Sequence, residues 1–288
     1  MTQNSDNCNS ACSSCSASCS SRTEPQTMPE PPKGPLPSTR VKRIIGVVSG
    51  KGGVGKSLVT GLMASAMARR GLKVGILDGD ITGPSIPKVF GLSTRALGNS
   101  EGVLLPVETR SGIRVMSINL LLKEDTDPVV WRGPVIAGAV EQFWHDVQWE
   151  ELDCLLVDMP PGTGDVPLTV FKSLPVDGIL VVTSPQELVS MIVTKAVHMA
   201  RMMDIPLLGL VENMAYASCP GCSDKIYVFG QDRVNRVAAE FDIPLLASIP
   251  IDPSIATLSD EGRIEDYENS FFDSFLDQLD TLVPLKED

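Results

Sequence analysis

A glycine-rich loop near residue 50 reads Gly50-Lys51-Gly52-Gly53-Val54-Gly55-Lys56-Ser57 and fits the pattern G-x-x-x-x-G-K-[ST]. The apolar run Ile44–Ser49 precedes it, and a helical pattern over residues 56–70 follows. In this setting backbone amides curl around a β-phosphate, and the helix N-terminus adds partial positive charge. Lys56 would neutralise phosphate oxygens, and the Ser57 hydroxyl would bind Mg²⁺. A glycine turn that merely caps a helix is disfavoured, because the match is complete and lies between strand and helix.

Short apolar runs and helical patterns alternate along the rest of the chain. The runs expected to form buried strands are Ile44–Ser49, Val74–Leu77, Cys154–Val157, Ile179–Val182, Leu207–Val211 and Leu245–Ile249. The clearest helical pattern between them is Glu187–Met203. This alternation is typical of an α/β fold, a mostly parallel, doubly wound sheet with helices on both faces. In such sheets the binding residues follow the carboxyl ends of the strands.

Acidic residues and glycines follow two further strand candidates. Asp78 and Asp80 come at the end of the second, where a carboxylate can orient an attacking water, although adjacent acids also occur in solvated turns. Asp158 ends the third candidate and is expected to support the magnesium ion. Gly162 follows it and allows close approach to a γ-phosphate. Three phosphate-facing loops at three strand ends predict hydrolysis of ATP or GTP.

A second lysine, Lys51, follows the first glycine of the loop, which does not need it for its own phosphates. It is either a solvated lysine or an extra positive charge delivered to the γ-phosphate of a facing subunit, as an arginine finger acts in trans. Because nothing else in the chain offers a positive partner to the transition state, we expect slow hydrolysis. The catalytic candidates are Lys51, Lys56, Asp80 and Asp158.

The charge balance narrows the choice of partners. The chain has 24 Lys and Arg against 36 Asp and Glu, a formal net charge of −12. Holding nucleic acid requires a basic face, so we expect no nucleic-acid partner. No apolar run is long enough for a transmembrane helix, and the C-terminal segment has an acidic rather than a basic polar face. We therefore expect no membrane partner and, without a signal-peptide pattern, a cytoplasmic protein.

The first 40 residues differ in composition from the rest. Residues 1–40 are rich in Cys, Ser and Pro without hydrophobic periodicity, which predicts a disordered tail and linker. Residues 41–288 carry the alternating pattern and are predicted to form one P-loop ATPase domain.

Other patterns predict packing rather than chemistry. The C-terminal residues expected to form one amphipathic helix that packs on the domain are Phe271, Phe275, Leu279 and Leu282. The methionines expected in the core are Met191, Met199, Met202 and Met203. Cys154 lies in an apolar run and is predicted to be a buried thiol. His145 and His198 have no partner at ligand spacing, so we predict no site for them.

The remaining cysteines form two groups. A reducing cytoplasm disfavours disulfides, so clustered thiols there indicate metal or redox sites. Cys219 and Cys222 form a C-x-x-C pair on a Pro-Gly turn, which suits one metal centre, a redox pair or half a zinc site. The tail thiols, spaced C-x3-C-x2-C-x3-C, are Cys8, Cys12, Cys15 and Cys19. We favour a small iron–sulfur cluster on these four, against a zinc or labile-iron site or incidental thiols.

The loop with its extra Lys51 resembles the deviant Walker A group of dimeric P-loop ATPases. This group includes the MinD and ParA positioning proteins, the nitrogenase iron protein and the Mrp/ApbC-type iron–sulfur carriers. The segments similar to the Mrp/ApbC branch are Asp78–Ser85 (DGDITGPS), Asp158–Asp165 (DMPPGTGD), Glu212–Met214 and Cys219–Cys222. The resemblance covers about residues 43–260.

The resemblance implies a homodimer that sandwiches two ATP molecules, with Lys51 reaching across the interface. It implies a labile [4Fe–4S] cluster bridging the subunits on Cys219 and Cys222 of each, to be handed to apo-proteins. It also places Asn213, Pro250 and Asp252 near the adenine.

Two rival functions share the same ATPase core. A MinD- or ParA-like positioning ATPase is opposed by the acidic charge, the acidic last helix and the C-x-x-C pair. An ATP-driven electron donor resembling the nitrogenase iron protein would also bridge a cluster, but on differently spaced cysteines.

Some eukaryotic carriers have an N-terminal motif of four cysteines. The tail of this chain departs from that motif, because the gaps between its cysteines are shorter.

Overall fold

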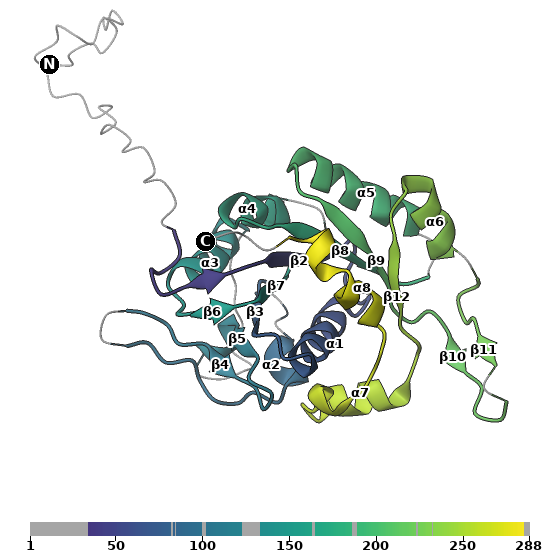
Figure 1. Ribbon diagram of the computed structural model, residues 1–288, viewed down its shortest axis with the longest axis horizontal. Coiled ribbons are helices and arrows are strands. Elements are labelled where there is room, and N and C mark those ends of the chain that lie inside the picture. Colours follow the sequence, from purple (N-terminus) through teal and green to yellow (C-terminus); the bar gives the residue numbers. More distant parts are fainter. Residues whose placement is uncertain are drawn as a thin grey trace, which may run out of the picture. The chain divides into compact units, whose positions relative to one another are not determined.

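A computed structural model of the chain describes residues 34–81, 83, 85–99, 102–122, 133–162, 165–185, 189–222, 224–231 and 233–284. An eight-stranded sheet lies at its centre, in the order β12-β9-β8-β2-β7-β3-β5-β4 (Figure 1). Its strands are β2 (Ile44–Ser49), β3 (Val74–Asp78), β4 (Val107–Glu108), β5 (Arg114–Met116), β7 (Cys154–Asp158), β8 (Gly178–Thr183), β9 (Leu207–Glu212) and β12 (Leu245–Ser248). Neighbouring strands run parallel except for β4 and β5. The predicted mostly parallel sheet is confirmed.

All six predicted strands are present, and β2 has the predicted bounds. This strand lies between β8 and β7, and every residue of it is buried. Burial on both faces explains why its sequence is continuously apolar rather than alternating. From β2 the chain passes beyond β7 to reach β3, whereas β8 and β9 lie on the other side. The strand order therefore reverses at the carboxyl end of β2, the position where open α/β sheets bind ligands.

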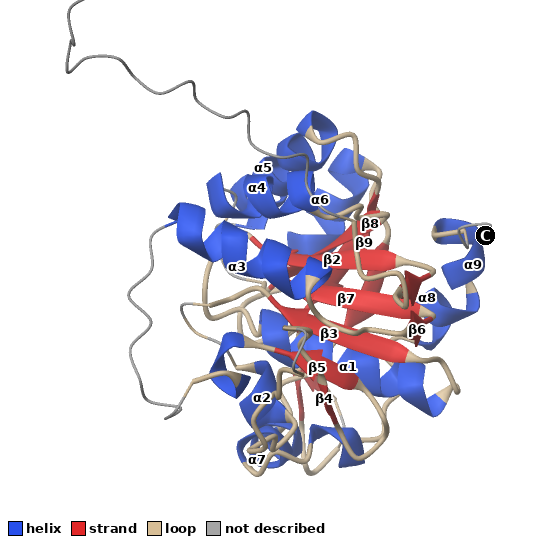
Figure 2. Ribbon diagram, turned by 90° about the vertical axis from the view of Figure 1, so that its left-hand side faces the viewer, coloured by secondary structure: helices blue, strands red, loops and turns tan. Residues whose placement is uncertain are grey.

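Helices cover both faces of the sheet, as Figure 2 shows. One face packs against α3 (Gly133–His145), α4 (Asp165–Ser173), α5 (Val189–Met202) and α6 (Arg233–Phe241). The other packs against α1 (Lys56–Arg69), α2 (Ile86–Val89), α7 (Pro253–Asp260), η2 (Ile264–Asp266), α8 (Asp273–Asp277) and α9 (Leu279–Leu282). A short turn, η1 (Ile118–Leu120), follows β5. In the described part of the chain, no helix combines the length and the apolar character needed to span a bilayer.

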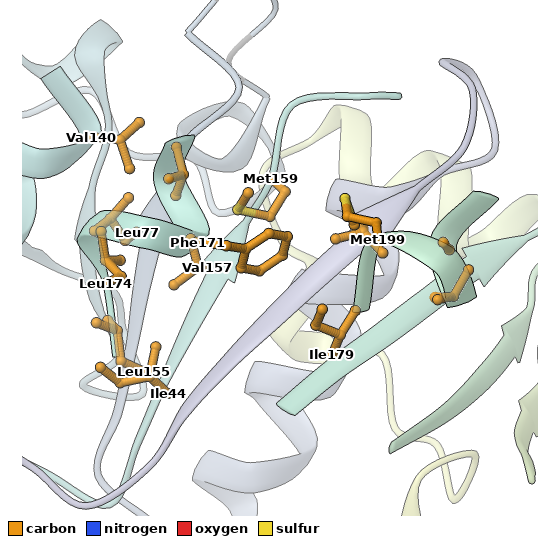
Figure 3. Packing of buried hydrophobic residues seen from close by; sticks show 14 of the residues in the cluster. Ile44, Leu77, Val140, Leu155, Val157, Met159, Phe171, Leu174, Ile179 and Met199 are labelled. Atoms are coloured by element: carbon orange, nitrogen blue, oxygen red, sulfur yellow. The ribbon is translucent and has the colours of Figure 1, made fainter. Parts of the chain in front are cut away.

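Side chains of the central strands alternate between two hydrophobic clusters. Ile44 and Val48 of β2, for example, pack on the α3–α6 side, whereas Ile45 and Val47 pack on the α1 side. Figure 3 shows the first cluster, in which Phe171 of α4 lies beside Val157 and Met159. The ring comes so close to the sheet that a Cβ on Gly46 would lie 2.8 Å from it. Cys154 is fully buried as predicted, and burial raises the pKa of its thiol to about 12.

Two packing predictions need correction. The C-terminal segment forms two short helices, α8 and α9, that meet at Gln278 instead of one amphipathic helix. Because helices of one turn are not stable alone, burial of Phe275 and Leu279 must hold them on the domain. Met191 and Met202 are exposed by 48% and 75%, so their assignment to the core is wrong. They lie on the same side of α5, eleven residues apart, away from the side that buries Met199.

Two further strand pairs lie outside the large sheet. Strand β1 (Arg40–Val41) pairs with β6 (Glu151–Leu152) in parallel. Strands β10 (Ala217–Ser218) and β11 (Lys225–Ile226) form an antiparallel hairpin, which projects from the body of the domain (Figure 1). This hairpin contains the C-x-x-C pair in its turn, so the cysteines are carried away from the sheet.

Candidate functional site

The phosphate-binding loop connects the central strand β2 to α1. Gly53 and Gly55 have positive φ angles of 79° and 81°, which glycine adopts without strain. Gly55 also ends the loop as the residue before α1, so the first helical residue is Lys56. Loop residues 50–57 thus place backbone amides and a helix N-terminus at the switch point of the sheet. The loop can cradle an anion there, as the sequence predicts.

The carboxylate of Asp158, at the end of β7, gathers three donors from α1. Its Oδ2 accepts hydrogen bonds from Lys56 Nζ at 2.6 Å and from Ser57 Oγ at 2.6 Å. Its Oδ1 accepts one from Thr60 Oγ1 at 2.7 Å. Asp158 and Thr60 are fully buried and Lys56 nearly so. A buried carboxylate requires such partners, because its desolvation would otherwise be prohibitive.

A second buried carboxylate, Asp78, lies on the neighbouring strand directly opposite Asp158. Its Oδ2 accepts a hydrogen bond from Ser117 Oγ at 3.0 Å, and its Oδ1 accepts one from the Asp80 amide at 3.2 Å. Burial, followed by repulsion from Asp158, raises the pKa of Asp78 to about 8, against an opposing effect of Lys56. Asp78 therefore supports the backbone that positions the partly exposed Asp80.

The raised pKa of Asp78 makes the stability of the nucleotide-free protein depend on pH. Between about pH 4 and pH 8 the folded protein keeps a proton that the unfolded chain has lost, so stability falls as pH rises through this window. Asp78→Asn removes this titration. We therefore expect the difference in unfolding temperature, variant minus unaltered protein, to be roughly 5 °C larger at pH 8 than at pH 5.5. Thermal unfolding at both pH values measures this gain, and equal differences at the two would contradict it.

Sequence reasoning missed two buried hydroxyl residues of this site, Thr60 and Ser117. Thr60 lies one helical turn after Lys56, so the (i, i+4) spacing was a usable signal. Ser117 follows β5 and reaches Asp78 only because β5 pairs with β3. No pattern near Ser117 in the sequence indicates that partner.

Asn213 joins the loop to the segment that carries the cysteines. Its side-chain amide donates to the Val54 carbonyl oxygen at 2.9 Å, and its own backbone amide donates to Thr183 at the end of β8. It lies so close to Gly55 that any Cβ there would overlap its amide nitrogen. Asn213 is therefore packed against the phosphate-binding loop.

The C-x-x-C pair lies in the turn of the β10–β11 hairpin. The Cys219 amide donates to the Asp224 carbonyl at 2.9 Å, which closes the turn. The backbone amides of Gly221 and Cys222, and then the Cys222 side chain, lower the pKa of the Cys219 thiol by hydrogen bonding. Cys222 is exposed, and its Sγ lies 3.2 Å from Asp224 Oδ2. A partly exposed thiol with a lowered pKa suits metal binding.

Within the described residues, no group of three or more His, Cys, Asp or Glu side chains could hold a metal ion. The hairpin thus offers two thiol ligands from one chain. Cys8, Cys12, Cys15 and Cys19 lie outside the described residues. Outside them, too, are four residues of the segments Asp78–Ser85 and Asp158–Asp165, namely Thr82, Pro84, Thr163 and Gly164.

The segment after β12 connects the hairpin to the domain. The Ile251 amide donates to the Tyr216 carbonyl at 2.6 Å, and Ile251 forms a β-bridge with Ala217. Asp252 caps α7 by accepting from the Ser254 amide at 2.8 Å, and it also accepts from the Tyr267 hydroxyl at 2.8 Å. The Ser254 hydroxyl, which donates to the same carboxylate at 2.7 Å, lowers the pKa of Asp252 most, and the Ser254 amide and the Tyr267 hydroxyl add to this effect. Asp252 thus has a structural role, and Pro250 precedes the bridge.

The other predicted residues also lie at this end of the sheet. Gly162, with a φ of 97°, donates its amide to the Ser49 carbonyl at 2.8 Å, beside the first residue of the loop. Gly50 packs so tightly against Ile192 of α5 that a Cβ would overlap it. Lys51 is partly exposed. The structure therefore brings together the predicted loop, the acids of β3 and β7, and Asn213.

The fold and this loop define a P-loop NTPase. Residues 40–282 match the ParA family model, which is described as "NUBPL iron-transfer P-loop NTPase". The chain belongs to this family. It is 44% identical over 248 residues to an iron-sulfur cluster carrier protein of Clostridium perfringens, with 83% of this chain and 87% of that protein covered.

Solved structures agree with this membership. A nucleotide-binding protein from Archaeoglobus fulgidus, in complex with ADP, is 46% identical with a TM-score of 0.74, covering 82% of this chain and 92% of that one. The cell division ATPase MinD of Pyrococcus furiosus shares the fold at 24% identity and a TM-score of 0.58, covering 84% of this chain and 99% of that one. The predicted resemblance and P-loop fold are thereby confirmed.

Proposed function

We propose that this protein is an ATP-hydrolysing iron–sulfur cluster carrier, which holds a labile [4Fe–4S] cargo on Cys219 and Cys222 and hands it to apo-proteins. The observation that carries the proposal is a projecting hairpin with two accessible thiols, on a chain of the iron-transfer NTPase family. Relatives named as cluster carriers, at 44–45% identity, support the same function. The C-x-x-C hairpin has no evident use in the rival positioning function.

The nucleotide end works through the residues around Asp158. Lys56 binds the β- and γ-phosphates of ATP. Hydrogen bonds to the phosphates also come from the backbone amides of Gly50, Gly52, Gly53, Val54 and Gly55. The Ser57 hydroxyl and the Asp158 carboxylate are oxygen donors that lie together, which fits the preference of Mg²⁺. Bound there, Mg²⁺ would neutralise charge on the phosphates. Asp80, held by Asp78, orients the attacking water, and Gly162 approaches the γ-phosphate.

A second copy of the chain completes both sites. Two thiolates are half of what a four-iron cluster needs, so the cluster bridges two hairpins. Exposed apolar side chains beside the cysteines support such contact: Ile226 and Val228 are exposed by 51% and 57%. Lys51 reaches the γ-phosphate of the facing subunit and stabilises the transition state.

Nucleotide state and cluster exposure are coupled through Asn213. Its amide holds the loop at Val54, and the chain from there to Cys219 is only six residues long. Met214, the next residue, has a positive φ of 58°, an uncommon backbone conformation for a residue with a side chain. The hydrogen bond from the Ile251 amide to the Tyr216 carbonyl then ties the hairpin to the segment after β12. The family resemblance puts the adenine near Asn213, Pro250 and Asp252. Binding of the base would therefore act on the residues that hold the hairpin.

The tail adds a second metal site. The four tail cysteines wrap a small cluster within one chain, ahead of the ATPase domain, which begins with Arg40 of β1 rather than at residue 41. Unlike the hairpin pair, this quartet needs no second subunit.

Cluster transfer tests the proposal. Anaerobically reconstituted full-length protein should restore activity to an apo-enzyme such as aconitase. The activity restored should increase in proportion to the amount of cluster-loaded protein added. Replacing the four tail cysteines with serine should lower iron per chain and leave transfer from the hairpin in place. Reconstituted protein that holds iron and sulfide but activates no apo-enzyme would refute the carrier function. Iron content unchanged by the tail substitutions would refute the tail cluster alone.

A further inference from the structure

We propose that Thr60 is a positioning residue, which holds the Asp158 carboxylate in place when the nucleotide phosphates take away its cationic donor, Lys56. The inference rests on the magnesium role proposed for Ser57 and Asp158 and does not depend on the cluster. Thr60 touches neither nucleotide nor metal in this assignment, because its hydroxyl is directed to the carboxylate.

The donors of Asp158 divide between its two oxygens. Oδ2 accepts from Lys56 Nζ and Ser57 Oγ, whereas Oδ1 accepts from Thr60 Oγ1. A phosphate-binding loop uses the lysine for phosphate oxygens and the serine for the metal. Lys56 is thus committed to the ligand once it binds, whereas Ser57 binds the metal through a lone pair of Oγ and keeps its hydrogen. The bond from Thr60 to Oδ1 stays, because no ligand group competes for it.

The backbone leaves the carboxylate of Asp158 one main freedom. Asp158 pairs with Val47 of β2 and with Asp78 of β3, and its carbonyl accepts from the Gly79 amide at 2.8 Å. The main chain is therefore fixed from both sides, and what remains is rotation of the side chain. A hydrogen bond to Oδ1 stops that rotation and leaves Oδ2 directed at the place that Ser57 Oγ occupies.

The fold presents the Thr60 hydroxyl to this carboxylate specifically. Thr60 lies one turn after Lys56 and is fully buried. Its Oγ1 is 3.1 Å from the Lys56 carbonyl but 2.7 Å from Asp158. A hydroxyl has one hydrogen to donate, and the shorter bond to a charged acceptor is the stronger. Ser65 on the same helix is a useful contrast, since its hydroxyl donates to the Gly61 carbonyl at 2.8 Å and has no carboxylate partner among the described residues.

Thr60→Val removes the donor at nearly constant volume, and Thr60→Ser keeps it. The measurement is binding of a fluorescent ADP analogue to the full-length protein, titrated with Mg²⁺ and repeated in excess EDTA. We expect the Mg²⁺ concentration for half-maximal enhancement of binding to rise about tenfold in Thr60→Val, the effect of losing one charge-assisted hydrogen bond. Metal-free binding should stay unchanged, as should the Mg²⁺ response of Thr60→Ser.

Ser65→Ala is the matched control, because it also removes a buried hydroxyl from α1 and should leave the Mg²⁺ response unaltered. If Thr60→Val does not fold, Thr60→Ala supplies the same comparison without a new branched side chain. An equal Mg²⁺ response in the Thr60 variants and the unaltered protein overturns this inference. A loss of metal-free binding as large as the loss with Mg²⁺ also overturns it. If Mg²⁺ has no effect on the unaltered protein, the magnesium role itself is wrong.

Discussion

Replacing Cys219 or Cys222 with serine is expected to abolish cluster binding at the hairpin. A bridging cluster needs two thiolates from each chain, so either substitution removes two of four ligands from the dimer. The serine hydroxyl is a poor ligand for iron because it stays protonated. Iron and sulfide per chain, measured after anaerobic reconstitution, should fall to the level supplied by the tail. In a background with the four tail cysteines also replaced, they should fall close to zero.

Cys154→Ala is the matched control for these variants. It removes one thiol from the same chain, but Cys154 is fully buried in β7, away from the hairpin. Its iron content should equal that of the unaltered protein. ATP hydrolysis should remain within about twofold in all three variants, since the residues around Asp158 are intact. Full iron content in Cys219→Ser or Cys222→Ser, in the tail-substituted background, would place the cluster elsewhere.

The fold was predictable because its decisive signals are local. Strand β2 has the bounds that its apolar run predicts, and the loop that follows contains its own glycines and lysine. Asp78 and Asp158 were found because each directly ends a buried strand, and parallel pairing places strand ends together. The family resemblance was carried by the same segments.

What remained hidden depends on contacts between distant segments. Ser117 becomes a partner of Asp78 through pairing of β5 with β3, and Asn213 becomes a partner of Val54 across 159 residues of chain. Neither pairing has a signature in its own neighbourhood. The misplaced methionines have a similar cause: α5 is apolar on more than one side, so composition alone could not tell Met199 from Met202.

Lys56→Ala is expected to lower ATP hydrolysis by at least about 10³-fold, because the phosphates lose their principal positive partner. It should also lower the unfolding temperature of the nucleotide-free protein. Lys56 Nζ lies 2.6 Å from Asp158, and removing it leaves a buried carboxylate without its cation. Lys51→Ala should stop hydrolysis with a smaller change in stability, since Lys51 is partly exposed. Both variants should keep their cluster, because the cysteines are untouched.

A mixture of the two inactive variants tests whether Lys51 acts across the dimer. In a mixed dimer, the loop of the Lys51→Ala chain still has Lys56 and receives Lys51 from its partner, so one site is complete. The other site lacks both lysines. Random pairing at equal amounts should therefore recover about a quarter of the original activity, since half of the dimers are mixed and each has one working site. Activity that stays at the level of the separate variants, in a mixture shown to exchange subunits, would mean that Lys51 serves its own loop.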